Sequence, residues 1–389
     1  MAAAFSLCSV FAACTSDAAA PGGNTFPESP DLPALTSGYI MLNGVMQPVD
    51  DNLLNALEQE INQPKTKAKD VMVSSYGMLE SAVGNDAMTI DSLTVVGPVD
   101  ATDIAFMKRC INEGSLRSVN LRDARIKDNS FPSKAFYTES SQTNSAVMAP
   151  LLRIVLPENL VEIGEGSFAY TMLNEISLPS SLRRLGANGF LGNVLFGGKI
   201  VIPEGVETIP YGCFRTGSDE PMSFDLPNTL LSIGDYAFDK SAIVSVVIPG
   251  STKTIGKSAF YESISENLVI EEGVERIDEM AFFGCSFRTL VLPSSVRYIG
   301  PYSFGLLSEL EGIYCLSDTP PVAVALTEYS GYTQQSHAFS SEICDCIGCS
   351  TPRTTPVYVP AGSKERYESA PGWSEWFMNF VEISDMPSL

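Results

Sequence analysis

Residues 178–190 read LPSSLRRLGANGF, and the spacing of three features in this stretch decides the fold. Pro179 is followed six residues later by a Leu-Gly pair and eleven residues later by Phe190. The same offsets recur at Pro157, Ile163-Gly164 and Phe168, and again at Pro293, Ile299-Gly300 and Phe304. A chain that returns to one pattern at a nearly fixed period indicates a repeat architecture.

Seven consecutive repeats align, and successive repeats are 22 or 24 residues apart. Their reference positions are Pro157, Pro179, Pro203, Pro227, Pro249, Glu271 and Pro293. Six residues further on stand Ile163, Leu185, Ile209, Ile233, Ile255, Ile277 and Ile299. Eleven residues further on stand Phe168, Phe190, Phe214, Phe238, Phe260, Phe282 and Phe304. A small residue precedes each phenylalanine, and an apolar pair such as Ile200 and Ile202 precedes each reference position.

Each repeat is predicted to form one turn of a solenoid. The apolar pair marks a short strand whose two side chains point inward. Proline ends the strand because it has no N–H for the next ladder hydrogen bond. The pattern therefore predicts an α/β solenoid of leucine-rich repeats of 22–24 residues. We expect a curved parallel β-sheet, an irregular or short-helical outer side, interior columns of isoleucine and phenylalanine, and caps at both ends.

The segments on either side of the seven repeats complete the predicted organisation. Related apolar patterns begin at Ile90 and Leu116 before them and at Leu310 after them, and residues 357–360 read as a strand. The lead-in is expected to hold a hairpin turn at Asn43-Gly44 and a helix near residues 51–61. We predict a lipoprotein-type signal at 1–14, a flexible tether at 15–37, a lead-in module at 38–88, the repeat solenoid at 89–315, and an enlarged terminal repeat with a cap at 316–389.

The repeats and both flanks resemble the BspA-like leucine-rich repeat proteins of anaerobic, Bacteroides-type bacteria. The repeat motif between residues 151 and 304 carries the resemblance. The stretch LTVVGPVDATDIAFMKRCINEGSLRSVNLRDARI at 93–126 is similar to their N-terminal lead-in, and VYVPAGSKERYESAPGWSEW at 357–376 is similar to their C-terminal cap. The resemblance implies a cell-surface or secreted binding scaffold, often discussed as an adhesin for host proteins.

The N-terminus predicts export. The first 13 residues, MAAAFSLCSVFAA, are almost wholly apolar and lead into Cys14, which resembles the cysteine that is lipidated in bacterial lipoproteins. The stretch is too short to span a bilayer. No basic residue precedes Lys65, so the usual basic start of a signal is missing, and an alanine-rich tail is the alternative. We predict a protein held at the outer membrane or cell surface through a lipid on Cys14 alone.

Composition and motifs restrict the function. The chain has 46 acidic and 24 basic residues, for a formal net charge of −22. This charge repels phosphate backbones, so nucleic acid is not an expected partner. The sequence holds no phosphate-binding loop, zinc-protease motif, EF-hand loop or nucleophile elbow, and its one histidine is His337. We predict a protein without enzymatic activity.

The exposed face of the predicted sheet is the main candidate site. Between the two inward residues of each strand lies one outward residue, and five of the seven are valines: Val155, Val201, Val247, Val269 and Val291. Arg153 flanks the first of them. An apolar stripe on a repeat sheet favours binding of a partner. The alternative is that valine simply suits a strand.

A second candidate is the segment HAFSSEICDCIGC, which holds His337, Cys344, Cys346 and Cys349. Three thiols and an imidazole are suitable ligands for a tetrahedral zinc ion, which is the one cofactor the sequence offers. A disulfide between two of the thiols is the alternative, because exported proteins favour disulfides. Residues 337–339 also supply the small residue and phenylalanine of the enlarged repeat.

The remaining cysteines and the tryptophans are predicted to be structural. Cys213 and Cys285 occupy repeat positions and read as buried packing residues, and Cys110 belongs to a lead-in helix. Trp373 and Trp376 are typical of a packed cap, with a carbohydrate platform as the alternative. The leading hypothesis is a scaffold that binds a host or bacterial surface protein. The alternatives are binding of a polysaccharide and a structural spacer without a ligand.

Overall fold

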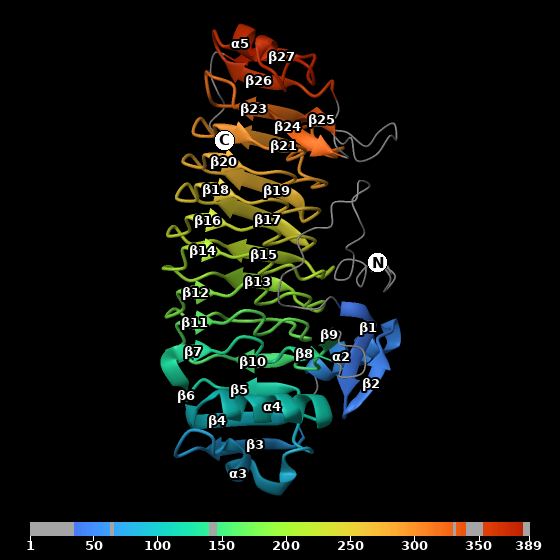
Figure 1. The fold of residues 1–389 in the computed structure, drawn as a ribbon, viewed down its shortest axis with the longest axis vertical. Coiled ribbons are helices and arrows are strands. Elements are labelled where there is room, and N and C mark those ends of the chain that lie inside the picture. The colour runs from blue at the N-terminus through green and yellow to red at the C-terminus, as the bar shows by residue number, and fades with distance from the viewer. Residues whose placement is uncertain (1–34, 63–65, 140–145, 330–331, 340–352, 384–389) are drawn as a thin grey trace. The chain divides into compact units, whose positions relative to one another are not determined.

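The computed structural model describes residues 35–62, 66–139, 146–329, 332–339 and 353–383 (Figure 1). The chain divides into two compact units. The described part of unit 1 lies within Thr25–Val206 and Gly212–Glu220, and that of unit 2 lies within Glu207–Tyr211 and Pro221–Leu389. Both units are built from parallel strands with few helices, so the predicted solenoid class is confirmed.

The broad sheet of unit 1 has the strand order β10-β5-β4-β3, with all neighbours parallel. The strands are β3 (Ala68–Met72), β4 (Ser92–Val99), β5 (Ser118–Asn120) and β10 (Arg153–Val155). The short β6 (Ala124–Ile126) also pairs with β4, and β13 (Gly198–Val201) lies further along the chain. The inward residues Leu93, Val119 and Ile154 are buried, as the repeat pattern predicts.

The broad strands of unit 2 follow the same plan. Parallel neighbours are β15 (Met222–Asp225), β17 (Ile243–Ile248) and β19 (Ile264–Ile270). A second parallel set contains β21 (Thr289–Leu292), β23 (Gly312–Cys315), β26 (Val357–Pro360) and β27 (Phe380–Ile383). The predicted strand at 357–360 is therefore present, with one further strand after it. Between β23 and β26 lies an antiparallel hairpin of β24 (Val324–Tyr329) and β25 (Tyr332–His337).

A second, narrow parallel sheet forms at the isoleucine that follows each proline. In unit 1 its strands are β7 (Ser130–Phe131), β11 (Glu162–Ile163) and β12 (Arg184–Leu185). In unit 2 they are β14 (Thr208–Ile209), β16 (Ser232–Ile233), β18 (Thr254–Ile255), β20 (Arg276–Ile277) and β22 (Tyr298–Ile299). Each strand is only two residues long. Outside the broad strands, the described repeats thus consist of turns and these short strands.

The lead-in contains the expected hairpin and helix. Strands β1 (Leu35–Leu42) and β2 (Val45–Pro48) are antiparallel and joined by Asn43 and Gly44, both at positive φ. This geometry is what an Asn-Gly hairpin turn requires. Helix α2 (Asp51–Asn62) follows. Strand β1 also pairs in parallel with β9 (Ala146–Met148), which pairs with β8 (Thr138–Glu139), so the hairpin joins a four-stranded sheet.

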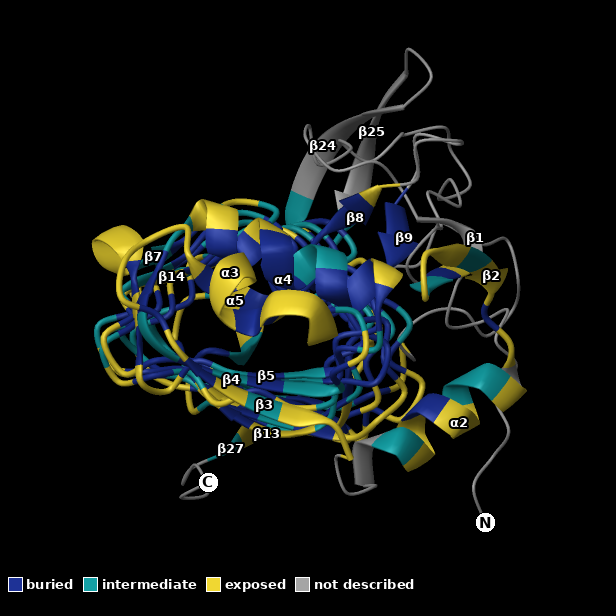
Figure 2. Cartoon of the chain, turned by 90° about the horizontal axis from the view of Figure 1, so that it is seen from below, coloured by how far each residue is buried: buried dark blue, intermediate teal, exposed yellow. Residues whose placement is uncertain are grey.

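Two described helices besides α2 precede the repeats in unit 1. Helix α4 (Ala101–Glu113) is mostly buried, whereas α3 (Leu79–Val83) and β3 are mostly exposed (Figure 2). Asp100 caps α4 by accepting from the backbone N–H of Thr102 and Asp103. The buried carboxylate of Asp103 accepts from the backbone N–H of Gly77, Leu79 and Asp100. Helix α3, the 3-10 turns η1 (Gly84–Asp86) and η2 (Lys127–Asn129), and α5 (Lys364–Ser369) are the other short helical elements.

The predicted phenylalanine column is present in each unit. In unit 1, Phe168 and Phe190 stack with ring centroids 5.4 Å apart, and Phe190 and Phe214 with centroids 5.1 Å apart. In unit 2, the rings of Phe238, Phe260, Phe282 and Phe304 stack at 4.9, 5.3 and 5.4 Å. All seven rings are fully buried. The column extends to Phe136 in unit 1 and to Phe339 in unit 2, so residues 337–339 supply the expected repeat position.

In five of the seven repeats a glycine follows the inward isoleucine or leucine and permits close approach of adjacent turns, whereas Pro210 and Asp278 take this place in the other two. A Cβ atom on Gly186 would lie 2.3 Å from the backbone nitrogen of Glu165, and one on Gly300 would lie 2.6 Å from that of Glu279. Real Cβ atoms do not make such contacts. Glycine at this position therefore sets the tight spacing between turns.

The residue two places before each phenylalanine adopts left-handed backbone geometry. These residues are Gly166, Asn188, Gly212, Tyr236, Ser258, Met280 and Tyr302, with φ between 51° and 58°. For residues other than glycine this conformation costs about 1–2 kcal/mol. The regular burial of the following phenylalanine offsets that cost, because the sharp turn directs its ring into the core.

Candidate functional site

The outer face of the broad sheet carries exposed apolar side chains. In unit 1, Val155 is 38% and Val201 is 52% exposed, whereas the inward Ile154 and Ile200 are buried. In unit 2, Val247 is 48% and Val269 is 47% exposed, and these two residues are directly paired in the parallel ladder. Alternation along the strands explains the arrangement, since successive side chains point to opposite faces. We refer to the outward residues of the broad strands as the outer face.

Two tyrosines extend the outer face in unit 2. Val291 is aligned with Tyr314 of β23, and Tyr314 with Tyr358 of β26. The two tyrosine rings stack with centroids 4.6 Å apart and an interplanar angle of 14°. Both rings lie over Gly312, where a Cβ would be 3.2 Å from the ring of Tyr358. The glycine therefore allows the rings to lie close to the sheet, where they remain partly exposed.

Sequence reasoning did not identify this tyrosine pair. The signal was available, because Tyr314 and Tyr358 each stand between two inward residues of a strand pattern, as the valines do. The prediction of outward residues covers only the seven regular repeats, and β23 and β26 lie beyond them. Gly312 is the second signal, since it removes a side chain beside Tyr314.

The strand expected in the second repeat is absent. Residues 174–178 contain the inward pair Ile176 and Leu178 but belong to no strand. The loop that follows is longer, and it inserts Phe196 into the core beside Phe190, with centroids 5.8 Å apart. The parallel ladder of unit 1 therefore ends at β10, which pairs with β5 and with no strand at residues 174–178. The sequence could not predict the missing strand, because the second repeat has the same alternation of apolar residues as the repeats that do form a strand.

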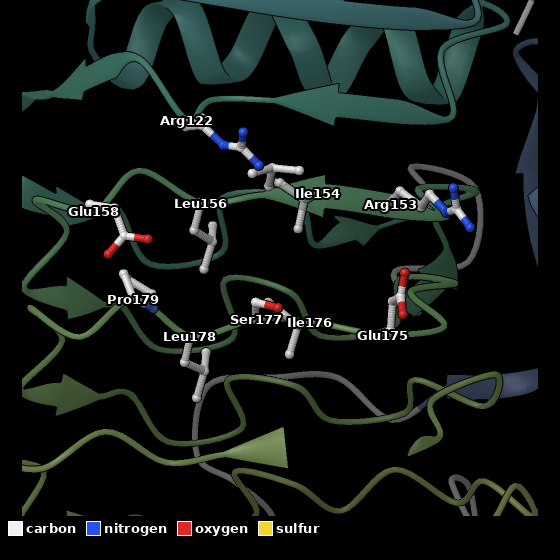
Figure 3. A pocket seen from close by; sticks show the side chains of 11 residues that line it. Arg122, Arg153, Ile154, Leu156, Glu158, Glu175, Ile176, Ser177, Leu178 and Pro179 are labelled. Atoms are coloured by element: carbon white, nitrogen blue, oxygen red, sulfur yellow. The ribbon is translucent and has the colours of Figure 1, made fainter. Parts of the chain in front are cut away.

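A pocket opens on the outer face at this interruption. Its volume is about 370 Å³, and its lining includes four charged side chains: Arg122, Arg153, Glu158 and Glu175. Figure 3 shows Arg153 and Glu175 at one end, Glu158 at the other, and Arg122 above Ile154. Val155, Leu156, Ile176 and Leu178 contribute apolar surface. The pocket lies wholly within unit 1.

The predicted metal site is only partly described. Three of the four candidate zinc ligands, Cys344, Cys346 and Cys349, lie outside the described residues. His337 is largely buried, with its Nδ1 3.9 Å from a carboxylate oxygen of Glu375 and its ring beside Trp376. Within the described ranges, no group of three His, Cys, Asp or Glu side chains is placed to hold a metal ion. Zinc binding stays a prediction.

The repeat cysteines are packing residues. Cys110, Cys213, Cys285 and Cys315 are buried free thiols. Burial raises the pKa of Cys285 to about 12 and that of Cys110 to about 11, because the thiolate is poorly solvated there. Cys285 Sγ donates to the carbonyl oxygen of Phe260 at 3.1 Å. A thiol with a raised pKa is a poor nucleophile at neutral pH, so these groups are suited to packing and not to chemistry.

The tryptophans belong to the C-terminal cap, as expected. Trp373 is fully buried, packs on Phe339 and Tyr367, and donates from Nε1 to the carbonyl of Pro321 at 2.9 Å. Trp376 is partly exposed, with the guanidinium of Arg353 4.9 Å from its ring centroid. A buried ring cannot stack on a sugar, so the two residues do not form a shared carbohydrate platform.

The predicted lipidation site, Cys14, lies outside the described residues. Among the described residues, no helix has the length and apolar character needed to cross a bilayer.

In-register strands, stacked phenylalanines and a broad outer sheet together define a leucine-rich repeat solenoid. The model of the BspA type leucine rich repeat region, present in six copies, matches residues 107–196, 129–265 and 197–311. These matches span 107–311, more than half of the 389 residues, and the protein belongs to this family. No curated protein matches the chain.

Several solved structures are similar to the chain at low identity. A leucine-rich repeat protein from Bacteroides ovatus is 17% identical, with 76% of this chain and 84% of that chain covered and a TM-score of 0.30. The pneumococcal vaccine antigen PcpA is 14% identical, with 76% and 79% covered and a TM-score of 0.37. A leucine rich cell surface protein from Faecalibacterium prausnitzii is 14% identical, with 64% and 74% covered and a TM-score of 0.35.

Proposed function

We propose that the protein is an exported scaffold that binds another protein through the outer face of its broad sheet. The observation that carries the proposal is the row of outward valines, of which Val201, Val247 and Val269 are each about half exposed. Val247 and Val269 are neighbours in the ladder, and exposed apolar side chains that gather on one surface favour contact with a partner. Repeat solenoids present such sheets as extended binding surfaces.

The proposed partner is a host or bacterial surface protein, and the proposed location is the outer membrane or cell surface. Support comes from the residues Ala12-Ala13-Cys14, which resemble a lipidation site, and from the family to which the chain belongs. Feeding the expressing bacteria a clickable fatty-acid analogue tests the anchor. Label on the wild-type chain that is lost in Cys14→Ser supports it, and equal labelling of both chains contradicts it.

Charge substitutions on the outer face test the binding role. Full-length protein is immobilised and exposed to purified host matrix and mucosal proteins, with surface plasmon resonance as the readout. Burying a charge at an apolar interface costs several kcal/mol, so Val247→Asp or Val269→Asp should weaken binding at least about tenfold. Leu231→Asp is the matched control, because Leu231 is 48% exposed and lies outside the broad strands. Equal binding by Val247→Asp and the control would contradict the role.

A polysaccharide ligand is the second candidate, and the stacked pair of Tyr314 and Tyr358 favours it. The two rings stack on one another, and their partly exposed surface offers apolar area and hydroxyl groups together. A glycan array probed with the wild-type chain and with Tyr358→Ala separates the two candidates. Signals that vanish in Tyr358→Ala favour the glycan. If no glycan on the array and no protein in the screens binds, the result favours a structural spacer.

A further inference from the structure

The four charged side chains of the outer-face pocket have no partners of their own. Among the residues that the structure describes, the side chains of Arg122, Arg153, Glu158 and Glu175 form no ion pair and no hydrogen bond. Elsewhere on the same unit, exposed opposite charges do pair, as Arg184 does with Glu162 at 2.8 Å. Unpaired charges of both signs around one cavity indicate a site that is completed by something else.

The mixture of charges restricts the chemistry of the ligand. A simple anion such as phosphate would be attracted by the two arginines but repelled by the two glutamates, and a simple cation would meet the reverse. A dipolar ligand satisfies both pairs. Its carboxylate would face Arg122 or Arg153, since guanidinium groups bind carboxylates through two parallel hydrogen bonds. Its ammonium or guanidinium group would face Glu158 or Glu175.

The interior of the pocket suits an apolar body between these charges. Leu156 and Ile176 are inward, buried residues that line the pocket with apolar surface, and residues 174–178 beside them belong to no strand. The volume of about 370 Å³ falls in the lower part of the range of roughly 300–1,000 Å³ seen for small-ligand pockets. In addition, the buried Nε–H of Arg153 has no acceptor within the described part of the chain. An unsatisfied buried donor costs free energy, which a ligand carboxylate would recover.

We propose that this pocket binds a dipolar amino-acid-type group with an aliphatic body, carried either by a free short peptide or by an internal peptide segment with one acidic and one basic side chain. The pocket shares Val155 with the outward valines of the outer face, but its proposed ligand is recognised by the four charged side chains and not by the valines. It adds a ligand class at one defined place on the outer face.

Isothermal titration calorimetry of the full-length protein at low salt tests the proposal with three probes. Leucyl-leucine has both terminal charges on an aliphatic body. Its doubly blocked form, N-acetyl-leucyl-leucine amide, has the same body without charges. Acetyl-Glu-Leu-Lys-amide carries its two charges on side chains. We expect binding of at least one charged probe and none of the blocked one. Which charged probe binds distinguishes a free peptide from an internal segment.

Two variants locate the binding within the pocket. Arg153→Gln and Glu175→Gln each remove one charge at nearly constant volume, and each should weaken binding about tenfold or more. Arg125→Gln is the matched control, because Arg125 is an exposed arginine of β6 outside the pocket. Binding by the blocked probe as tight as by the charged ones would overturn the proposal. So would equal effects of Arg153→Gln and Arg125→Gln, or no binding of either charged probe at millimolar concentration.

These outcomes are separable from those of the protein-binding test. If no probe binds but Val247→Asp still abolishes partner binding, the pocket proposal fails and the proposed function stands. If the probes bind and Val247→Asp has no effect, the reverse holds.

Discussion

Within each unit, the phenylalanines of successive turns stack on one another. Phe260, for example, lies between Phe238 and Phe282, with centroids 4.9 and 5.3 Å away. Removing one ring leaves a cavity bordered by aromatic surface on both sides, which neighbouring side chains cannot fill without moving the backbone.

Phe260→Ala should lower the free energy of unfolding by about 3–5 kcal/mol, as expected for a fully buried ring. Tyr261→Ala provides the comparison, since Tyr261 is the next residue and is partly exposed. Urea unfolding followed by far-ultraviolet circular dichroism measures both. Equal losses for the two variants would show that the column is not the main packing element of that turn.

The buried thiols predict a loss of stability at alkaline pH. The pKa of Cys285 is raised from 9.0 to about 12 by burial, so the folded state holds the proton that the unfolded state releases. Its contribution is complete below pH 9 and falls as the pH rises toward 12. The midpoint of urea unfolding should therefore decrease across this window, and less steeply in Cys285→Ala. An identical pH profile in the two proteins would contradict the assignment.

At the scale of the repeat, polar side chains three residues after the phenylalanine satisfy carbonyl groups inside the solenoid. Asn193 is fully buried and donates from Nδ2 to the carbonyls of Phe168 and Phe190 at 2.8 and 2.9 Å. Its Oδ1 accepts from the hydroxyl of Thr171 at 2.6 Å. Buried backbone acceptors need such partners, because no water reaches them.

Asn193→Leu should destabilise unit 1 by about 2–4 kcal/mol, because the carbonyl of Phe190 and the backbone N–H of Leu173 both lose their partner. Asn267→Leu is the control, since Asn267 is exposed on the outer face and should change stability by less than about 0.5 kcal/mol. Differential scanning calorimetry compares the two. A midpoint for Asn193→Leu as high as that of the control would mean that the buried network contributes nothing.

The sequence pattern predicted those features of the fold that need a particular residue type at a fixed place in each repeat or turn. The inward isoleucines, the phenylalanine column and the Asn43-Gly44 hairpin all follow from local chemistry and were confirmed. The narrow sheet was not predicted, because strands of two residues such as Thr254–Ile255 are too short to show the alternation of inward and outward residues that marks a strand. The gap at residues 174–178 and the charged pocket were also missed. They depend on where Phe196 packs and on distances between turns, which no linear pattern contains.

At the scale of the whole molecule, the net charge and the exposed side chains of the sheet together determine which partners can bind. The formal net charge of −22 keeps the protein soluble and discourages acidic partners. Binding at the outer face must then come from burial of the valines and the tyrosine pair, with mixed charges such as those around the pocket providing specificity.

Hydroxyl-radical footprinting of the protein with a partner obtained in the binding screen tests this account most directly. Tyr358 lies on the outer face, whereas Tyr298 lies in the narrow sheet, and both are partly exposed. We predict that the partner lowers the oxidation of Tyr314 and Tyr358, together with Val247 and Val269, and leaves Tyr298 and Leu231 unchanged. Protection of Tyr298 and Leu231 with no change at Tyr358 and Val247 would contradict the assignment of the outer face as the binding surface.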